Sequence, residues 1–344
     1  MPLLHAIGSA RNGGAETFFV SLIQELHARN IRQTAVIKKH EGRQSALAAM
    51  GVSVRTAPFG GLVDPMTKRI IARTAAQAGA DTILTWMSRA SWHAPAAGRS
   101  GPRVVARVGG FYNVKYYRNC DHIIAIAPQI ANHLTAQGWP QDKLSIIPNF
   151  CAVDFNVPAV NRESLATPAD APVILALSRL HPVKGLDVLI RAVARLDGVY
   201  LWLAGDGDEQ AALAALAREL GAADRVRFLG WRSDRAGLIN AADIIAFPSR
   251  REPLGSVVVE AWAGGKPIVA SDVDGPAWLI DHGETGLLAP PEDVDALQEQ
   301  LAALISSPDE ARRLAANGRQ QAETTYARDR IIDAYERVLV PWSA

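Results

Sequence analysis

The chain has 344 residues, of which 49% are hydrophobic, and this is enough to fill the cores of two domains of ordinary size. No run approaches the roughly 18 apolar residues that span a bilayer, and the start Met1–His5 lacks the charged residues and long apolar stretch of a signal peptide. Composition therefore argues against a membrane-spanning protein, and we expect a soluble, globular protein of the cytoplasm.

The net charge of +1 hides an asymmetry between the two parts of the chain. Residues 1–150 contain 17 Lys and Arg but 7 Asp and Glu, whereas the remainder contains 19 and 28. A basic first part favours an anionic partner, either an acidic acceptor or membrane headgroups, although a solvated basic face without a partner is an equal alternative. The basic residues are scattered and accompany no nucleic-acid motif, so nucleic acid is not an expected partner.

The two cysteines, Cys120 and Cys151, match no metal-ligand spacing. We therefore expect free thiols in a reducing compartment, and the sequence suggests no metal site.

Strand-like and helix-like segments alternate through the first half of the chain. The predicted strands are 3–7, 34–38, 53–56, 82–86, 104–108, 123–127 and 144–147, and the predicted helices are 16–29, 45–50 and 65–78. This alternation predicts a parallel sheet covered by helices.

A glycine pair, Gly13-Gly14, separates the first predicted strand from the first predicted helix. Glycines let the backbone approach a ligand closely, because no Cβ stands in the way. The loop is neither a Walker A loop nor a dinucleotide fingerprint, and an ordinary turn is the alternative.

Further along, the run 115–118 places two tyrosines between two cations. Such residues stack on sugar rings or lie at headgroup interfaces, so Lys115, Tyr116 and Arg118 are the candidate acceptor contacts, with an ordinary helix surface as the alternative. The nearby His93 is expected to be a polar surface residue of a loop rather than a catalytic group.

The segment 158–172, rich in Pro, Ala, Asn and Asp, is the predicted linker. We therefore expect one domain over 1–157 and a second over 173–325.

The second domain again alternates. Its predicted strands are 173–177, 200–204, 226–229, 242–249 and 267–270, and its predicted helices are 186–195, 256–263 and 293–305. Arg179 and Lys184 follow the first of these strands, at the edge where open α/β sheets bind ligands, and two cations there would neutralise a diphosphate. The glycine loop at 205–208 lacks the third glycine of a nicotinamide-binding fingerprint.

The segment from Glu252 to Gly264 contains two acids, Glu252 and Glu260, on either side of a proline, a glycine and an apolar run. Gly255-Ser256 begins the predicted helix, whose free N–H groups form an anion site, and Glu260 lies roughly 7 Å further along it. Two acids flanking a phosphate position can hold the hydroxyls of a nucleotide sugar. The alternative is two solvated charges.

Glu252, Glu260 and the following residues 261–270, together with Arg179 and Lys184, resemble the signature of the retaining GT-B glycosyltransferases of family 4, or group 1. The resemblance implies an α/β fold of two Rossmann-like domains facing across a cleft, with the final helix, 326–344, crossing back to the first domain. It implies catalytic roles for Arg179, Lys184 and Glu252. It also implies these donor contacts: Gly13, Gly14, Gly230, Trp231, Gly255, Ser256 and Glu260. A histidine that many relatives carry near the transferred sugar is replaced here by Gly109 or Gly110.

The function that the resemblance implies is transfer of a sugar, with retention, from a nucleotide-diphosphate sugar to an acceptor hydroxyl, without metal or cofactor. We expect a glycan or a lipid-linked acceptor in cell-surface glycan or lipopolysaccharide synthesis, with peripheral contact at the inner membrane face. The alternatives are a sugar-nucleotide epimerase and a non-catalytic protein that binds nucleotide sugars. A nicotinamide-dependent oxidoreductase is disfavoured by the missing fingerprint.

Overall fold

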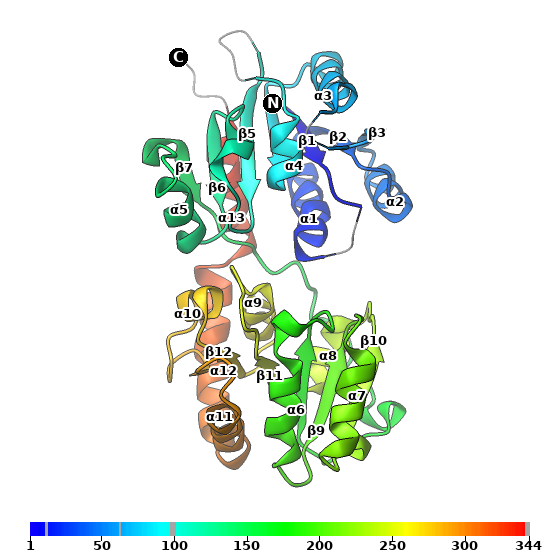
Figure 1. Ribbon diagram of the computed structural model, residues 1–344, viewed down its shortest axis with the longest axis vertical. Coiled ribbons are helices and arrows are strands. Elements are labelled where there is room, and N and C mark those ends of the chain that lie inside the picture. Colours follow the sequence, from blue (N-terminus) through cyan, green and yellow to red (C-terminus); the bar gives the residue numbers. More distant parts are fainter. Residues whose placement is uncertain (11–12, 62, 97–100, 341–344) are drawn as a thin grey trace. The chain divides into compact units, whose positions relative to one another are not determined.

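The computed structural model describes residues 1–10, 13–61, 63–96 and 101–340 (Figure 1). The chain forms two compact units, the first from Met1–Ala152 with Arg328–Ala344, and the second from Val153–Ala327. Each unit is an α/β layer structure with its own sheet and its own apolar core.

The first unit is built on a sheet of seven parallel strands in the order β3-β2-β1-β4-β5-β6-β7. Its strands are β1 (Pro2–Ile7), β2 (Arg32–Ile37), β3 (Ser53–Thr56), β4 (Thr82–Trp86), β5 (Arg103–Val108), β6 (His122–Ala125) and β7 (Leu144–Ile146). Its helices are α1 (Gly14–Ala28), α2 (Glu41–Ala49), α3 (Pro65–Ala78), α4 (Met87–Trp92), α5 (Pro128–Thr135) and α13 (Arg328–Leu339), with the 3₁₀-helices η1 (Val114–Tyr117) and η2 (Gln141–Lys143).

The C-terminal helix α13 completes the core of the first unit (Figure 1). Its apolar face buries four side chains, Ile331, Ile332, Tyr335 and Leu339, in the cluster that also contains Phe18 and Leu22 of α1. On the polar side, Arg29 at the end of α1 pairs with Asp329 at 3.0 Å and with Glu336 at 3.2 Å. The first sheet is thus covered partly by residues from the far end of the chain.

The second unit is built on six parallel strands in the order β10-β9-β8-β11-β12-β13. Its strands are β8 (Val173–Leu177), β9 (Tyr200–Ala204), β10 (Val226–Gly230), β11 (Ile244–Phe247), β12 (Ile268–Ser271) and β13 (Leu287–Ala289). Its helices are α6 (Leu186–Ala194), α7 (Gln210–Glu219), α8 (Arg235–Ala241), α9 (Ser256–Ala263), α10 (Asp274–Leu279), α11 (Val294–Ser306) and α12 (Pro308–Thr324), with the 3₁₀-helices η3 (Arg162–Leu165), η4 (Pro182–Lys184) and η5 (Ala223–Arg225). Two parallel α/β sheets confirm the predicted fold class.

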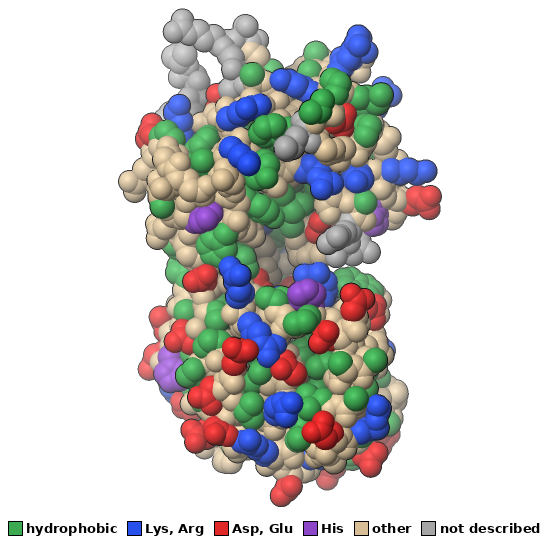
Figure 2. All heavy atoms as spheres, in the orientation of Figure 1, with side chains coloured by type: hydrophobic (Ala, Val, Ile, Leu, Met, Phe, Trp, Pro, Cys, Tyr) green, Lys and Arg blue, Asp and Glu red, His purple; other side chains and the backbone are tan. Residues whose placement is uncertain are grey.

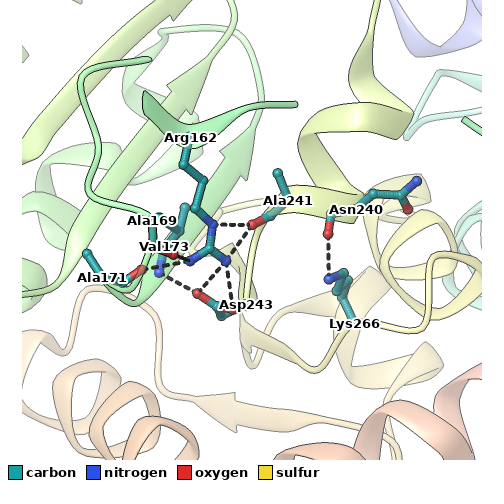
Figure 3. A network of polar contacts seen from close by, with 8 residues as sticks. All are labelled: Arg162, Ala169, Ala171, Val173, Asn240, Ala241, Asp243 and Lys266. Carbon is teal, nitrogen blue, oxygen red and sulfur yellow. Dashed lines mark hydrogen bonds and ion pairs between the residues drawn. The ribbon is translucent and has the colours of Figure 1, made fainter. Parts of the chain in front are cut away.

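Residues 158–172, expected as a linker, are packed onto the second unit through Arg162 (Figure 3). The Arg162 guanidinium donates to the Ala241 carbonyl at 3.0 and 2.7 Å and pairs with Asp243 at 2.9 Å. It also donates to the carbonyls of Ala169 and Ala171 within the segment itself. Trp202 donates to the Thr167 hydroxyl at 2.9 Å, and Arg227 donates to the carbonyls of Leu165 and Ala166, so the segment is fixed at more than one point. A composition rich in Pro and Asn does not reveal such contacts, because their partners lie far away in the sequence.

No helix among the described residues is both long enough and apolar enough to cross a membrane.

Candidate active site

The candidate site of the second unit lies at the carboxyl edge of its sheet, where β8 and β11 are neighbours. The strand order reverses there, since β9 lies on the other side of β8 and β12 on the other side of β11. Open α/β sheets bind ligands at such a switch point, outside the carboxyl ends of the strands. The loop after β8 carries Arg179 and Lys184, and the loop after β11 carries Glu252 and Gly255.

These two loops meet in an ion pair between Lys184 and Glu252. The Lys184 Nζ lies 2.6 Å from Glu252 Oε2, and each side chain is 17% exposed. The ammonium group also lies 5.5 Å from the ring centre of Phe247, the last residue of β11. Lys184 and Glu252, which the sequence predicted separately, therefore form one ion pair that is largely buried but still partly accessible to solvent.

A glycine lets the two loops approach so closely. Gly185 has φ +62°, and a Cβ at this position would lie 2.1 Å from the carbonyl oxygen of Pro248. No real side chain tolerates that distance, so only glycine fits between Lys184 and the first residue of α6.

Arg250 also holds the loop after β11 against the loop after β8. Its backbone N–H donates to the Val183 carbonyl at 2.8 Å, and its guanidinium bonds both carboxylate oxygens of Asp187 at 2.9 and 2.8 Å. A third bond, of 2.8 Å, joins it to Glu292. Burial raises the pKa of Asp187, but the hydrogen bonds from Arg250 outweigh it and hold that pKa below its ordinary value. Sequence reasoning missed Arg250, because a single arginine in a loop gives no pattern.

The start of α9 faces the same edge. Gly255 precedes the helix with φ +84°, a left-handed conformation that suits glycine, and a Cβ there would lie 3.1 Å from the Phe247 ring. Beneath it, the Gly275 N–H donates to the Glu252 carbonyl at 2.8 Å. The first N–H groups of a helix have no partners inside the helix, and with its dipole they favour an anion. Gly255 and Ser256 thus begin a helix next to the Lys184–Glu252 pair.

Glu260 lies on the buried side of α9 and is 8% exposed. Its Oε2 accepts a bond of 2.5 Å from Arg235, the first residue of α8. Burial raises the pKa of Glu260, while the neighbouring Arg235 charge lowers it, and the net direction is upward. Arg235 was not foreseen, since nothing in the sequence links it to an acid 25 residues away.

Helix α12 supports α9 from the outside. Gly318 lies against Trp262, where a Cβ would come within 2.1 Å of the indole ring, and the indole N–H donates to the Thr285 carbonyl at 2.7 Å. The helix that carries Glu260 is therefore fixed by contacts with α12 and with the Thr285 backbone.

Arg179 is exposed, and none of the described residues pairs with its side chain. Its loop is packed on two glycines of the β9 loop, Gly205 and Gly207, where a Cβ would lie 1.9 Å from the Ser178 carbonyl oxygen and 2.1 Å from that of Leu180. Gly230 forms an isolated bridge with Gly205, and the side chain of the following Trp231 is 60% exposed. These residues lie at the same edge of the sheet as the ion pair.

Comparison with known proteins identifies the family. Residues 159–321 match the family described as glycosyl transferases group 1, and residues 12–155 match glycosyltransferase family 4. The chain is 36% identical over 335 residues to the lipopolysaccharide core biosynthesis glycosyltransferase LpsE of Rhizobium meliloti, covering 96% of each chain. The chain is a group 1, family 4 glycosyltransferase. This confirms the predicted resemblance.

Two further likenesses agree with this family. LpsD of the same organism, also a lipopolysaccharide core biosynthesis glycosyltransferase, is 35% identical over 338 residues and 97% of each chain. The crystal structure of Anabaena HepE in complex with UDP-glucose has a TM-score of 0.84 at 24% identity, covering 98% of this glycosyltransferase and 99% of HepE. The glycosyltransferase therefore has the GT-B fold.

The other predicted site residues of the glycosyltransferase belong to its first unit. Gly13 and Gly14 lie where α1 begins, after β1, and β1 and β4 are neighbours at the switch point of the first sheet. Residues 11–12, just before them, lie outside the described part of the chain.

Lys115, Tyr116 and Arg118 form an aromatic-cation cluster with Trp92. The Lys115 ammonium lies 5.4 Å from the Tyr116 ring centre, the Arg118 guanidinium 4.3 Å from that of Trp92, and the two rings meet edge to face at 5.9 Å. Tyr117 between them is fully buried, so only part of the predicted run faces solvent.

The expectation for His93 was wrong. Its side chain is 4% exposed at the end of α4 and lies edge to face with Phe59. Burial lowers the pKa of His93, opposed by the nearby carboxylate of Asp64. The imidazole is a buried group rather than polar surface.

Proposed function

We propose that this glycosyltransferase moves a sugar from a nucleotide-diphosphate sugar to a hydroxyl of a lipopolysaccharide core acceptor, with retention of anomeric configuration. The observation that carries the donor proposal is the pair of Lys184 and Glu252 at 2.6 Å, beside the start of α9. The names of LpsE and LpsD support the acceptor class, and UDP-glucose bound to HepE supports the donor class.

The leaving group determines what the site has to do. As the anomeric C–O bond breaks, negative charge grows on the diphosphate, and preorganised donors aimed at that charge stabilise the transition state more than the ground state. Lys184, Arg179 and the amides at Gly255 and Ser256 would supply them. A metal ion is not required in this proposal, because these groups already offset the charge.

The ion pair gives Lys184 and Glu252 a shared role. While they are paired, Glu252 holds the ammonium group in place. A diphosphate that approaches Lys184 replaces the carboxylate as its partner, and Glu252 is then released to accept hydrogen bonds from the hydroxyls of the transferred sugar. Binding of donor would thus exchange one partner of each group for another, without leaving a buried charge uncompensated.

The remaining donor contacts follow from the resemblance. Glu260, already held by Arg235, would accept the ribose hydroxyls, and the loop of Gly230 and Trp231 would line the base. Gly13 and Gly14 of the first unit are proposed as donor contacts on the resemblance alone. The leaving phosphate would take the proton of the acceptor hydroxyl, which allows retention without a protein nucleophile.

On the acceptor side, we assign Lys115, Tyr116 and Arg118 to the glycan. Their flat rings and adjacent cations suit a sugar that carries acidic groups. The enzyme would work in the cytoplasm, with its basic first unit at the anionic inner face of the membrane. Sedimentation with anionic but not with neutral vesicles tests that location, and equal sedimentation with both would contradict it.

The test of the function is product analysis. The enzyme is incubated with lipopolysaccharide of truncated core and, in turn, with UDP-, GDP- and ADP-sugars. We expect one donor to add one sugar by mass spectrometry, with the anomeric configuration of the donor in the NMR spectrum of the product. Isomerisation of a donor in the absence of acceptor, or an inverted linkage, would contradict the proposal.

A further inference from the structure

Arg107 of β5 is a buried cation in the first unit. It is 1% exposed, and its guanidinium lies between the rings of Phe18 and Trp86, 4.6 and 4.7 Å from their centres. Its Nε donates to the Tyr335 hydroxyl at 3.0 Å, and its Nη2 donates to the Asn149 side chain. Two of the three guanidinium nitrogens thus connect β5 to α13 and to Asn149, which follows β7.

The third nitrogen, Nη1, has no hydrogen-bond partner among the described residues, although it is buried. The positive charge is also not neutralised: no described acid pairs with Arg107, and Asn149 is neutral. Burial raises the pKa of Tyr335, with Arg107 opposing, so this hydroxyl also stays neutral near pH 7. A guanidinium remains charged at any such pH, and a buried charge without counterion is costly even between two aromatic faces.

The chain next to Nη1 lacks a side chain. A Cβ on Gly109 would lie 3.8 Å from Nη1 and 3.4 Å from Cδ1 of Ile126. Gly109 follows β5 at the carboxyl edge of the first sheet, where parallel sheets bind ligands. It is also one of the two positions at which the family resemblance led us to expect a histidine.

We propose that Nη1 of Arg107 and the space beside Gly109 form a binding subsite for the anionic group of a substrate, a phosphate or a carboxylate. A planar guanidinium suits both groups, and either would supply the missing countercharge and hydrogen-bond acceptor together. Among the charged side chains that Figure 2 shows on the first unit, Lys and Arg are more numerous than Asp and Glu, and residues 1–150 have 17 Lys and Arg against 7 acids, so an anion is attracted to this unit. The anion could belong to the acceptor or to the donor diphosphate. This choice is the only part of the inference that rests on the function proposed above.

The test uses inorganic phosphate as the probe and the full-length chain. In the first arm, the phosphate titrations use the background variant Arg179→Ala/Lys184→Ala, which lacks the two cations assigned to the donor. Their outcome therefore does not depend on whether those two residues bind the donor. By titration calorimetry, we expect Gly109→Ala to weaken phosphate binding roughly tenfold or more, because a methyl group obstructs a charged hydrogen bond. The methyl meets its neighbours at ordinary contact distances, so the fold is expected to stay intact, which circular dichroism checks.

Gly42→Ala is the matched control, since its Cβ also meets only ordinary contacts, at 3.6 Å from the His40 ring. It should leave phosphate binding unchanged. Arg107→Lys keeps the positive charge but loses the planar set of N–H donors, so it should also weaken phosphate binding. A folded Arg107→Lys variant with unchanged phosphate affinity would overturn the proposal. Absence of phosphate binding, or equal affinity in Gly109→Ala and Gly42→Ala, would overturn it as well.

A second arm distinguishes the two sources of the anion. Phosphate is titrated into the unaltered protein with and without saturating UDP. Binding that persists under UDP and remains sensitive to Gly109→Ala supports a subsite for the acceptor. If UDP abolishes the part of the binding that is sensitive to Gly109→Ala, the subsite belongs to the donor diphosphate.

Discussion

At the scale of single residues, each of the two acids predicted for the site of the second unit is paired with a cation. Glu252 is paired with Lys184 and Glu260 with Arg235, at 2.6 and 2.5 Å. Each acid is partly or largely withdrawn from water, where a lone charge would be unfavourable. The pairing holds both carboxylates in a fixed orientation, as the proposed binding of sugar hydroxyls requires.

Glu260→Gln tests the role of the more buried acid. Because charged hydrogen bonds to ribose hydroxyls would be lost, we expect UDP affinity to fall roughly tenfold or more by calorimetry. Unchanged affinity would contradict the assignment. Asp295→Asn, an exposed acid of the same unit, is the control and should bind UDP as before.

The same variant has an expected pH dependence. The pKa of Glu260 is raised in the folded protein, so the folded state binds more protons than the unfolded state between the two pKa values. The contribution of Glu260 to stability is therefore full below its unfolded pKa and is lost as pH rises through the folded pKa. Relative to the unaltered protein, the melting temperature of Glu260→Gln should rise as pH increases over that window. A constant difference would contradict it.

The sequence predicted both members of the Lys184–Glu252 pair, but only Glu260 of the Glu260–Arg235 pair. Glu252 and Glu260 belong to one spaced motif, and Lys184 follows a predicted strand together with Arg179, so all three were predicted as site residues, and their roles stay proposals. Arg235 and Arg250 were missed, because their importance comes from contacts with residues 25 and 63 positions away. Arg107 was missed for a related reason: an arginine in an apolar strand looks like an outward-facing residue until its two stacking rings are known.

At the scale of elements, the site depends on loops that pack backbone against backbone. Gly185, Gly205, Gly207 and Gly275 all lie where a Cβ would collide with a main-chain atom of a neighbouring loop. Such contacts fix the loops that carry Arg179, Lys184 and Glu252 without using their side chains.

Gly185→Ala and Gly198→Ala form a matched pair that separates collision from backbone strain. Both glycines have positive φ, +62° and +71°, but only Gly185 has a neighbour within 4 Å. We expect Gly198→Ala to cost about 1 kcal/mol of unfolding free energy and to keep activity. Gly185→Ala should cost about 1–3 kcal/mol more and lower kcat roughly a hundredfold, since Lys184 moves.

Chemical denaturation and steady-state kinetics measure both effects. If the two variants lost the same stability and the same activity, the contact with Pro248 would not be what positions Lys184.

The sequence predicted the exact bounds of several helices and strands, namely those with clear start and stop signals. Strands β3, β4, β8 and β9 and helices α3 and α9 have the predicted bounds. Helices α7 and α12 were not predicted, because their buried residues are few and small: Leu213 and Ala217 in α7, and Leu314, Ala315 and Gly318 in α12. A weak apolar stripe identifies such a helix poorly, although α12 packs firmly on α9 through its glycine.

At the scale of the whole molecule, the two units depend differently on the end of the chain. Helix α13 belongs to the first unit and contributes Ile331, Ile332, Tyr335 and Leu339 to its core. Burying one such side chain contributes about 1.5–3 kcal/mol, and a domain is stable by only about 5–15 kcal/mol.

A chain that ends at Ala327 should therefore lose the cooperative melting of the first unit, while the second unit still binds UDP. Calorimetric melting and titration measure the two properties separately. Arg337→Ala, at an exposed position of α13, is the control and should change neither. A truncated chain whose first unit melts as before would contradict the assignment of α13 to that core.

The central claim, that Lys184 stabilises the departing diphosphate, is tested most directly by the transfer rate of Lys184→Ala. Arg218→Ala, which removes an exposed cation of the same unit, is the control. We expect kcat for Lys184→Ala to fall roughly a hundredfold or more, the size of effect seen when one charge-stabilising donor is removed, and kcat for Arg218→Ala to stay unchanged. Transfer by Lys184→Ala at the original rate would contradict the account.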